Sequence, residues 1–271
     1  MPLIAVASVK SSPGVTTTAL ALAAMWPAQR RLLLEADPAG GDLGPWLGLP
    51  PAPGLVGLAA AARHDHGGES VWQHAQQVAD GLYVVVAPVG AEQASACLST
   101  LTGTGMASQF TNQSGVVVAD CGRLDPGSPA LVIAAHADLT LLLVRPLVSE
   151  LSHLAPRIAA LTAAGLRLGL LLAPAVGRGP AEPSYSAHEI TATLDLPVHA
   201  SLPADPRSIA QLISGRGSPG GATRRRPLLQ TATALAALLD DPASQPRPGP
   251  QAGDMLPTRD TAEVTAGDQY S

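Results

Sequence analysis

Long apolar runs recur along the chain, and within each run the residues stay apolar instead of alternating with polar ones. They lie at residues 2–9, 30–38, 81–89, 114–122, 137–146 and 166–174. Uninterrupted apolar runs predict strands that are covered on both faces. A shorter strand and a following loop are predicted within residues 196–206.

Segments of helical composition separate these runs, at residues 16–26, 90–101, 149–165, 186–196 and 227–241. Pro27 is expected to end the first of them. Alternating strands and helices predict an α/β fold with a doubly wound, mainly parallel sheet and right-handed crossovers. We expect one domain over residues 1–240, with the Gly-rich segment 214–227 as a flexible loop inside it. Residues 241–271, rich in Pro and Gly, are predicted to form a disordered tail.

Composition narrows the protein class. The chain has 271 residues, is 46% apolar and carries a net charge of −5, which favours a globular protein over a dedicated nucleic-acid binder. Its apolar runs fall short of the roughly 20 residues that a membrane-spanning helix needs, so we expect a soluble, cytoplasmic protein. Cys97 and Cys121 are predicted to be buried thiols. His64, His66 and His74 are predicted to lie in a solvated loop, without metal-ligand spacing.

The first strand leads into the segment "VKSSPGVTTT", residues 9–18. A strand, a Gly-containing turn and a helix that opens on Thr form the usual frame of a phosphate-binding loop, whose helix N-terminus attracts anions. In the pattern G-x-x-x-x-G-K-[ST] a lysine precedes the hydroxyl residue, and here that position holds Val15. Lys10 is the only lysine of the chain. Taken alone, the segment also fits an ordinary strand-to-helix turn.

Two aspartates follow predicted strands. Asp37, in "EADPAGGD", follows the second predicted strand, and Asp120 follows "VVVA". Because ligands of open α/β sheets bind beyond the carboxyl ends of the strands, both carboxylates are candidate site residues. A carboxylate such as Asp120 beside a hydroxyl such as that of Thr16 suits Mg²⁺. The alternative is that both aspartates only cap turns or helices.

Together these segments resemble the ParA/MinD family of P-loop ATPases, whose deviant Walker A motif reads K-G-G-x-G-K-[ST]-T. The residues that match it are Lys10, Ser11, Ser12, Pro13, Gly14, Val15, Thr16 and Thr17. The resemblance covers about residues 3–240 and implies a P-loop NTPase fold that binds ATP and Mg²⁺. It implies that Lys10 reaches the partner subunit's nucleotide in a homodimer and that Asp37 lies near the attacking water. Thr16 and Asp120 are implied Mg²⁺ ligands.

The chain departs from that motif at three positions. Val15 replaces the cis lysine, and Ser11 and Ser12 replace glycines that let the backbone approach phosphate. Losing a charge-assisted contact predicts nucleotide binding weakened by about 10- to 100-fold. The family's adenine-recognising Asn is absent as well, since Ala173 and Pro174 occupy that region. The stretch at residues 36–49 looks closest to the TadZ/CpaE and septum-site-like branch, which tolerates altered phosphate loops.

Three functional hypotheses follow. The first is a ParA/MinD-like, nucleotide-responsive positioning or scaffolding protein with weak or no hydrolysis, which serves a membrane-associated machine such as a Tad-type pilus or the division site. The second is an active DNA-partitioning ATPase that contacts DNA non-specifically through Arg224, Arg225 and Arg226. The third is a pseudo-ATPase that binds only protein partners. No basic amphipathic pattern is present in the tail, so direct membrane insertion is not expected.

Overall fold

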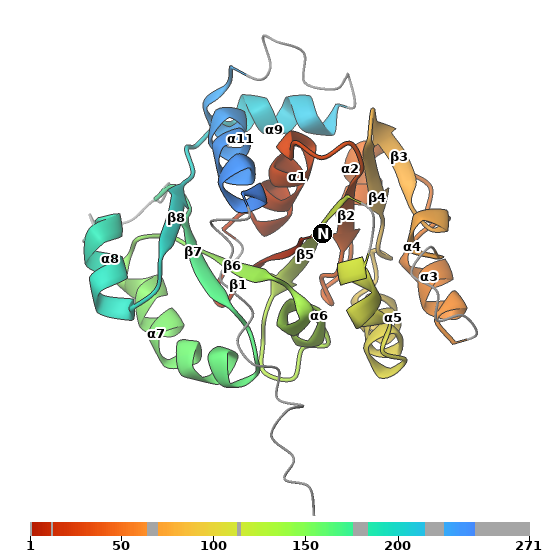
Figure 1. The fold of residues 1–271 in the computed structure, drawn as a ribbon, viewed down its shortest axis with the longest axis horizontal. Coiled ribbons are helices and arrows are strands. Elements are labelled where there is room, and N and C mark those ends of the chain that lie inside the picture. Colours follow the sequence, from red (N-terminus) through yellow and green to blue (C-terminus); the bar gives the residue numbers. More distant parts are fainter. Residues whose placement is uncertain are drawn as a thin grey trace, which may run out of the picture.

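The computed structural model describes residues 2–11, 13–63, 70–112, 115–175, 184–214 and 225–241. These residues form an eight-stranded sheet in the order β3-β4-β2-β5-β1-β6-β7-β8, with helices on both faces (Figure 1). Every neighbouring pair is parallel except β3 and β4, which are antiparallel. The predicted doubly wound, mainly parallel α/β fold is therefore confirmed.

All strands except β3 lie in predicted strand segments and are shorter than these, although β5 extends one residue beyond its run, to Arg123. Their bounds are β1 Leu3–Ser8, β2 Arg31–Glu35, β3 Gln76–Ala79, β4 Leu82–Val85, β5 Val116–Arg123, β6 Leu139–Val144, β7 Leu168–Leu172 and β8 Val198–Ser201. Strand β1 lies in the middle of the order, between β5 and β6. Only β3 had no apolar run to indicate it, because it is a short antiparallel strand at the edge of the sheet.

The predicted helices are present as α1 Val15–Met25, α5 Ala91–Gly103, α7 Val148–Ala163, α8 Ala187–Leu194 and α11 Pro227–Asp240. Elements that the sequence did not indicate are short: α2 Leu43–Leu47, α3 Leu55–Ala61, α4 Ser70–Gln73, the 3₁₀ helix η1 Met106–Asn112, α6 Ala130–His136 and α9 Pro206–Ile213. Short helices depend on tertiary packing, so their composition gives a weak signal.

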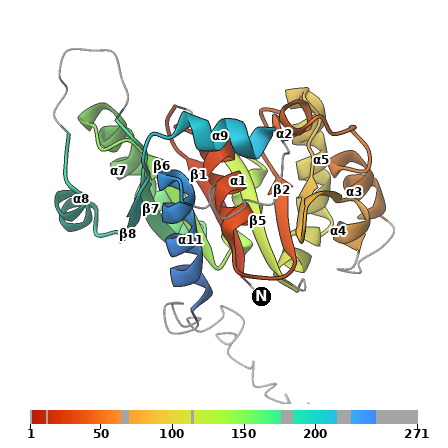
Figure 2. The same ribbon diagram turned by 90° about the horizontal axis from the view of Figure 1, so that it is seen from above.

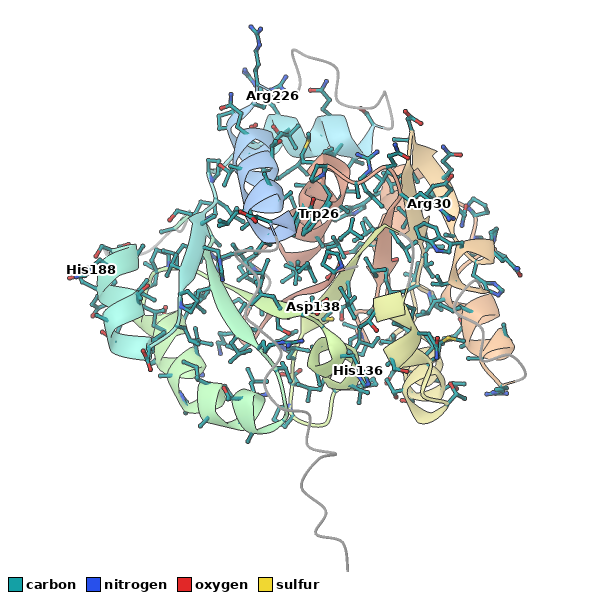
Figure 3. The ribbon with its side chains drawn as sticks, viewed as in Figure 1. Trp26, Arg30, His136, Asp138, His188 and Arg226 are labelled. Atoms are coloured by element: carbon teal, nitrogen blue, oxygen red, sulfur yellow. The ribbon has the colours of Figure 1, made fainter. Side chains whose placement is uncertain are left out.

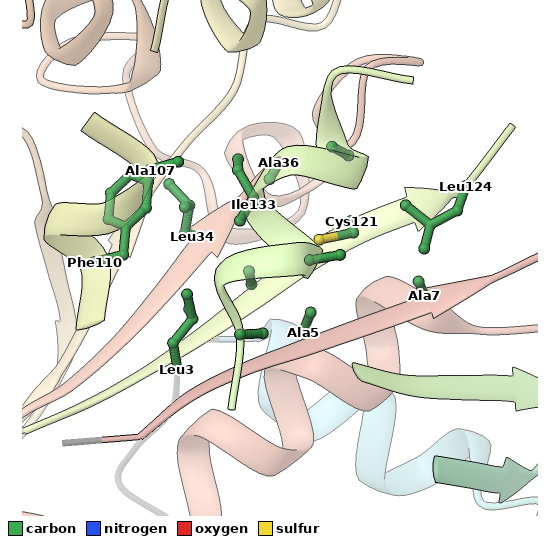
Figure 4. Close-up of a cluster of buried hydrophobic side chains, with 14 of the residues drawn as sticks. Leu3, Ala5, Ala7, Leu34, Ala36, Ala107, Phe110, Cys121, Leu124 and Ile133 are labelled. Atoms are coloured by element: carbon green, nitrogen blue, oxygen red, sulfur yellow. The ribbon is translucent and has the colours of Figure 1, made fainter. Parts of the chain in front are cut away.

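A hydrophobic core lies on each face of the sheet. In Figure 1, α1, α9 and α11 lie above the sheet, and α5, α6 and α7 lie below it. Figure 2 shows α1 and α11 side by side, and Trp26 at the end of α1, labelled in Figure 3, donates from Nε1 to Asp240 Oδ1 of α11 at 3.0 Å. On the other face, Phe110 and Ile133 pack against β-strand residues such as Leu34 (Figure 4). This arrangement buries both faces of the central strands.

Other expectations from the sequence are partly covered by the described residues. Cys97 and Cys121 are both buried and free, as predicted. The tail prediction concerns residues 241–271, all of which lie outside the described residues except Asp241. Residues 215–224 of the Gly-rich segment also lie outside them. None of the helices in the described part of the chain is long and apolar enough to cross a bilayer.

Candidate phosphate-binding cleft

An open cleft of about 590 Å³ lies where β1, β2 and β5 end. Four segments line it: the end of β1, the start of α1, the segment that follows β2, and the end of β5. The lining residues are Ser8, Gly14, Val15, Thr16, Thr17, Asp37, Pro38, Ala39, Asp42, Trp46, Gly122, Arg123 and Asp125. The cleft therefore occupies the position where open α/β sheets bind their ligands.

The start of α1 presents backbone donors to this cleft. Gly14 caps the helix in the left-handed conformation (φ 105°), and no side chain caps the first turn. The Thr18 N–H and hydroxyl both donate to the Gly14 carbonyl, at 2.9 and 2.8 Å. The N–H groups of a helix's first turn have no acceptor within the helix, so those of Val15, Thr16 and Thr17 are available to an anion.

Val15 stands at the position of the missing lysine and is only 6% exposed. Its side chain belongs to the core on the α1 face, together with Val6 and Leu20, while it also lines the cleft. The start of α1 therefore offers the cleft a helix N-terminus and two threonine hydroxyls, but no charged side chain.

The residues before Gly14 are placed differently. Ser11 has a positive φ of 58°, and its hydroxyl donates to Glu150 Oε1 at 3.1 Å. Glu150 is buried and also accepts from the backbone N–H and the Nη1 of Arg145, at 2.8 and 2.6 Å. Lys10 is exposed, and neither it nor Ser11 nor Pro13 lines the cleft. Ser12 lies outside the described residues.

Asp120 is a buried carboxylate of β5, paired in register with Val6 of β1 and Glu35 of β2. Its Oδ1 accepts from the Gly122 N–H at 3.1 Å, whereas its buried Oδ2 has no hydrogen-bond partner in the described part of the chain. Burial raises the pKa of Asp120 to about 7, although the neighbouring Thr16 hydroxyl and the Gly122 N–H act to lower it. A buried carboxylate oxygen without a partner, beside a hydroxyl, fits the oxygen donors that Mg²⁺ requires.

Asp37 lies on the wall of the cleft, two residues after β2. Its Oδ1 accepts from the Ala39 N–H at 2.8 Å, and its carboxyl group packs directly on the backbone of Gly122. Burial is the main cause that raises its pKa, the charges of Asp42 and Asp125 raise it further, and Arg123 lowers it. The structure thus brings Asp37, Asp120 and residues 14–17 to one end of the sheet.

Glu35 is a further acid of this region that the motif comparison did not single out. It is buried at the end of β2 and accepts three backbone N–H bonds, from Asp42 at 2.6 Å and from Leu43 and Ala87 at 2.8 Å. Burial is the main cause that raises its pKa, and these three bonds act in the opposite direction. Glu35 therefore ties the cleft-lining segment 37–42 to the sheet. An acid that ends an apolar strand was the available signal.

Arg123 and its partner Asp125 were also missed. Arg123 is the last residue of β5, and its Nη2 lies 2.9 Å from Asp125 Oδ2. Both side chains are more than half exposed at the mouth of the cleft. The apolar run predicts a strand that ends at Gly122, one residue before Arg123, so the pattern does not indicate this arginine as a site residue.

The remaining candidates lie away from the cleft lining. Arg226, labelled in Figure 3, directly precedes α11, and its Nε donates to Gln211 Oε1 of α9 at 3.0 Å. Arg225 is exposed, and Arg224 lies outside the described residues. His74 is partly buried beside Gly57, while His64 and His66 also lie outside. The described residues contain no group of three or more His, Cys, Asp or Glu side chains suited to a metal.

Substitution of Gly122 by alanine tests how closely the Asp37 carboxyl group packs against this glycine. A Cβ at Gly122 would lie 2.1 Å from the Asp37 carboxyl carbon, whereas a Cβ at Gly127 would meet nothing within 4 Å. Both glycines have positive φ, 55° and 80°, so alanine costs about 1–2 kcal/mol of backbone strain at either position. We expect Gly122→Ala to lose a further 1–3 kcal/mol, roughly, through overpacking. Urea unfolding of the two variants measures this, and equal losses would contradict the close contact.

Comparison with known proteins places the fold. No family model and no curated sequence matches the chain. Among solved structures, the septum site-determining protein MinD from Pyrococcus horikoshii, complexed with Mg-ADP, is 19% identical. It superposes with a TM-score of 0.68 over 89% of this chain and 97% of that one.

Two further solved structures have a similar fold. A ParA family ATPase from Chlorobium tepidum is 16% identical, with a TM-score of 0.67 over 87% of this chain and 97% of its own. An ATP complex of a McdA variant from Cyanothece is 16% identical, with a TM-score of 0.61 over 88% and 96%. Nearly the whole length of each protein aligns with residues of this chain. The chain thus has the P-loop NTPase fold of the MinD and ParA-family ATPases.

Proposed function

We propose that this chain is a positioning protein of the ParA/MinD family whose cleft binds ATP together with Mg²⁺. The observation that carries the proposal is the buried Oδ2 of Asp120, which has no hydrogen-bond partner among the described residues and lies beside Thr16 at the start of α1. The structures of similar fold that contain Mg-ADP or ATP support it.

Each residue has a defined part in this proposal. The backbone N–H groups of residues 14–17 hold the phosphates, and Thr16 and Asp120 hold Mg²⁺. The chemistry that Mg²⁺ would supply there is neutralisation of phosphate charge. Asp37 orients water for attack on the terminal phosphate. Because Val15 contributes no positive charge, we propose that hydrolysis is weak or absent.

The proposal extends to partners. The protein is a homodimer through the face around Lys10, and Lys10 contacts the partner subunit's nucleotide. It acts in the cytoplasm on protein partners of a membrane-associated machine, such as a pilus assembly or the division site. Non-specific DNA bound through Arg224, Arg225 and Arg226 is the alternative partner.

Thermal unfolding and size-exclusion chromatography with ATP·Mg²⁺, ADP·Mg²⁺ or no ligand test this function. Ligand at 100 times its Kd stabilises the native state by about 2.7 kcal/mol, which raises Tm by roughly 5–10 °C for a domain of this size. We expect ATP·Mg²⁺ to raise Tm and to induce a dimer. Lys10→Ala is expected to lose the dimer but to keep the Tm shift, because Lys10 is exposed and lies outside the cleft lining.

Lys10→Arg is the matched control, since it keeps the charge at the same place. If millimolar ATP·Mg²⁺ leaves both Tm and the elution volume unchanged, the proposed nucleotide site is wrong and the pseudo-ATPase hypothesis takes its place.

A further inference from the structure

The charges that line the cleft are unusual for a site that binds phosphate. Three carboxylates line it, those of Asp37, Asp42 and Asp125, and Asp120 is buried next to the lining residue Thr16. Arg123 is the only cation among the described lining residues. A polyphosphate adds further negative charge, and charge brought into a partly buried site is costly unless it is paired. In a phosphate loop with its own lysine, that lysine balances part of the phosphate charge. Because the position of that lysine here holds Val15, a bound polyphosphate depends more strongly on the charge of Arg123.

Arg123 stands in a suitable place. It ends β5 three residues after Asp120, and the pairing of β5 with β1 aligns it with Ser8, which directly precedes the loop segment 9–14. It also lies close enough to Asp37 to influence the ionisation of that carboxyl group. The Arg123 guanidinium is thus at the mouth of the cleft, near both the start of the loop segment 9–14 and the Asp37 carboxyl group. Arginine suits phosphate because its planar fork can donate two parallel hydrogen bonds.

The present partner of Arg123 is easily exchanged. Its Nη2 and Nε lie 2.9 and 3.0 Å from the same oxygen, Asp125 Oδ2. Both side chains are more than half exposed, and ion pairs at such positions contribute little to stability. A phosphate group inside the cleft carries more charge than Asp125 and accepts through several oxygens. Asp125 therefore competes with phosphate for Arg123.

We propose that Arg123 supplies, within the same subunit, the positive charge that Val15 no longer provides, by binding the β- and γ-phosphates of the nucleotide. Asp125 holds the guanidinium at the rim until phosphate takes its place. This inference rests on the proposed function, and it differs from the part given to Lys10, because Arg123 acts in the monomer and Lys10 acts across the dimer.

Calorimetric titration with ADP·Mg²⁺, at a protein concentration where the wild type is monomeric, tests the inference. We expect Arg123→Ala to weaken binding by about 10- to 100-fold, as for loss of a charge-assisted contact. Asp125→Asn is expected to have the opposite effect and to tighten binding by about 2- to 10-fold, because the carboxylate that competes with phosphate for Arg123 is removed. Opposite effects at two residues that contact each other cannot come from a general loss of folding.

Arg167→Ala is the matched control. Arg167 is a partly exposed arginine that is also paired with an aspartate, Asp138 at 3.6 Å, but it is not among the residues that line the cleft. Its replacement is expected to leave the Kd unchanged. AMP provides a second control, since it lacks the phosphates that Arg123 binds and its affinity should not respond to Arg123→Ala.

The outcomes separate the two proposals. If the wild type binds no ADP·Mg²⁺, the proposed function is wrong. If the wild type binds and Arg123→Ala binds within about twofold of it, Arg123 has no part in phosphate binding, although the nucleotide site stands. Weaker ADP·Mg²⁺ binding by Asp125→Asn would contradict the proposed competition between Asp125 and phosphate, and would place Asp125 among the groups that help binding.

Discussion

Replacement of Glu35 by alanine is expected to lower the free energy of unfolding by about 3–6 kcal/mol, a large part of the stability of a domain. The Glu35 carboxylate accepts the backbone N–H groups of Asp42, Leu43 and Ala87. Each buried N–H left without an acceptor costs about 1–3 kcal/mol, and relief from burying the carboxylate offsets part of the sum. Urea unfolding at neutral pH measures the loss.

Glu35→Gln is the matched control for this experiment. The amide oxygen can still accept from Asp42 and Leu43, which share Oε1, while the amide nitrogen would face the Ala87 N–H, which donates to Oε2. We expect a loss of about 1–3 kcal/mol, from that one bond. Hydrogen exchange should also speed up at the Asp42 and Leu43 amides in Glu35→Ala alone. If the two variants lost equal stability, these hydrogen bonds would not be what ties segment 37–42 to the sheet.

Replacement of Asp120 by asparagine is expected to stabilise the ligand-free protein at pH 8 and to abolish its response to Mg²⁺. The folded state raises the pKa of Asp120 from 3.8 to about 7. Below pH 3.8 both states are protonated and the group has no effect on stability. Between pH 3.8 and 7 the unfolded state releases the proton while the folded state keeps it, so stability falls as the pH rises. Above pH 7 the loss is constant, at about 4 kcal/mol.

The Asp120→Asn variant removes this charge but leaves an amide group where Oδ2 has no partner, which costs about 1–3 kcal/mol. The net gain at pH 8 is then about 1–3 kcal/mol, and near pH 4, where the charge penalty is gone, it should turn into a loss of about 1–3 kcal/mol. Urea unfolding at several pH values, without nucleotide, measures it. ATP·Mg²⁺ should stabilise the wild type but not the variant. A pH-independent difference between the two proteins would contradict a raised pKa at Asp120.

Most of the sheet could be predicted from the sequence, because strands covered on both faces need apolar residues at nearly every position. The runs that contain β1, β2, β4, β5, β6 and β7 stand out for that reason. Strand β3 and the helices α2, α3 and α6 could not be predicted in this way. They are short, and their stability comes from contacts with other elements, which a local pattern does not record.

Some residues of the candidate site could likewise be predicted from local sequence patterns, and others could not. Residues 14–17 and Asp120 were predictable, because a Gly turn before a helix and an acid after an apolar strand are local patterns. Glu35 was not, because its three donors lie seven, eight and 52 residues further along the chain. Arg123 was missed because its place beside Ser8 depends on the pairing of β1 with β5.

The sequence by itself therefore determined most of the strands, the main helices, the Gly-containing turn before α1 and the absence of a lysine at residue 15, since each of these follows from neighbouring residues. Tertiary structure alone decided which charges share the cleft. It placed Lys10 and Ser11 outside the lining, left Oδ2 of Asp120 without a partner among the described residues and put Arg123 at the mouth of the cleft. The physical reason is that strand pairing and burial set the distances between charges, and residues far apart in the chain take part in both.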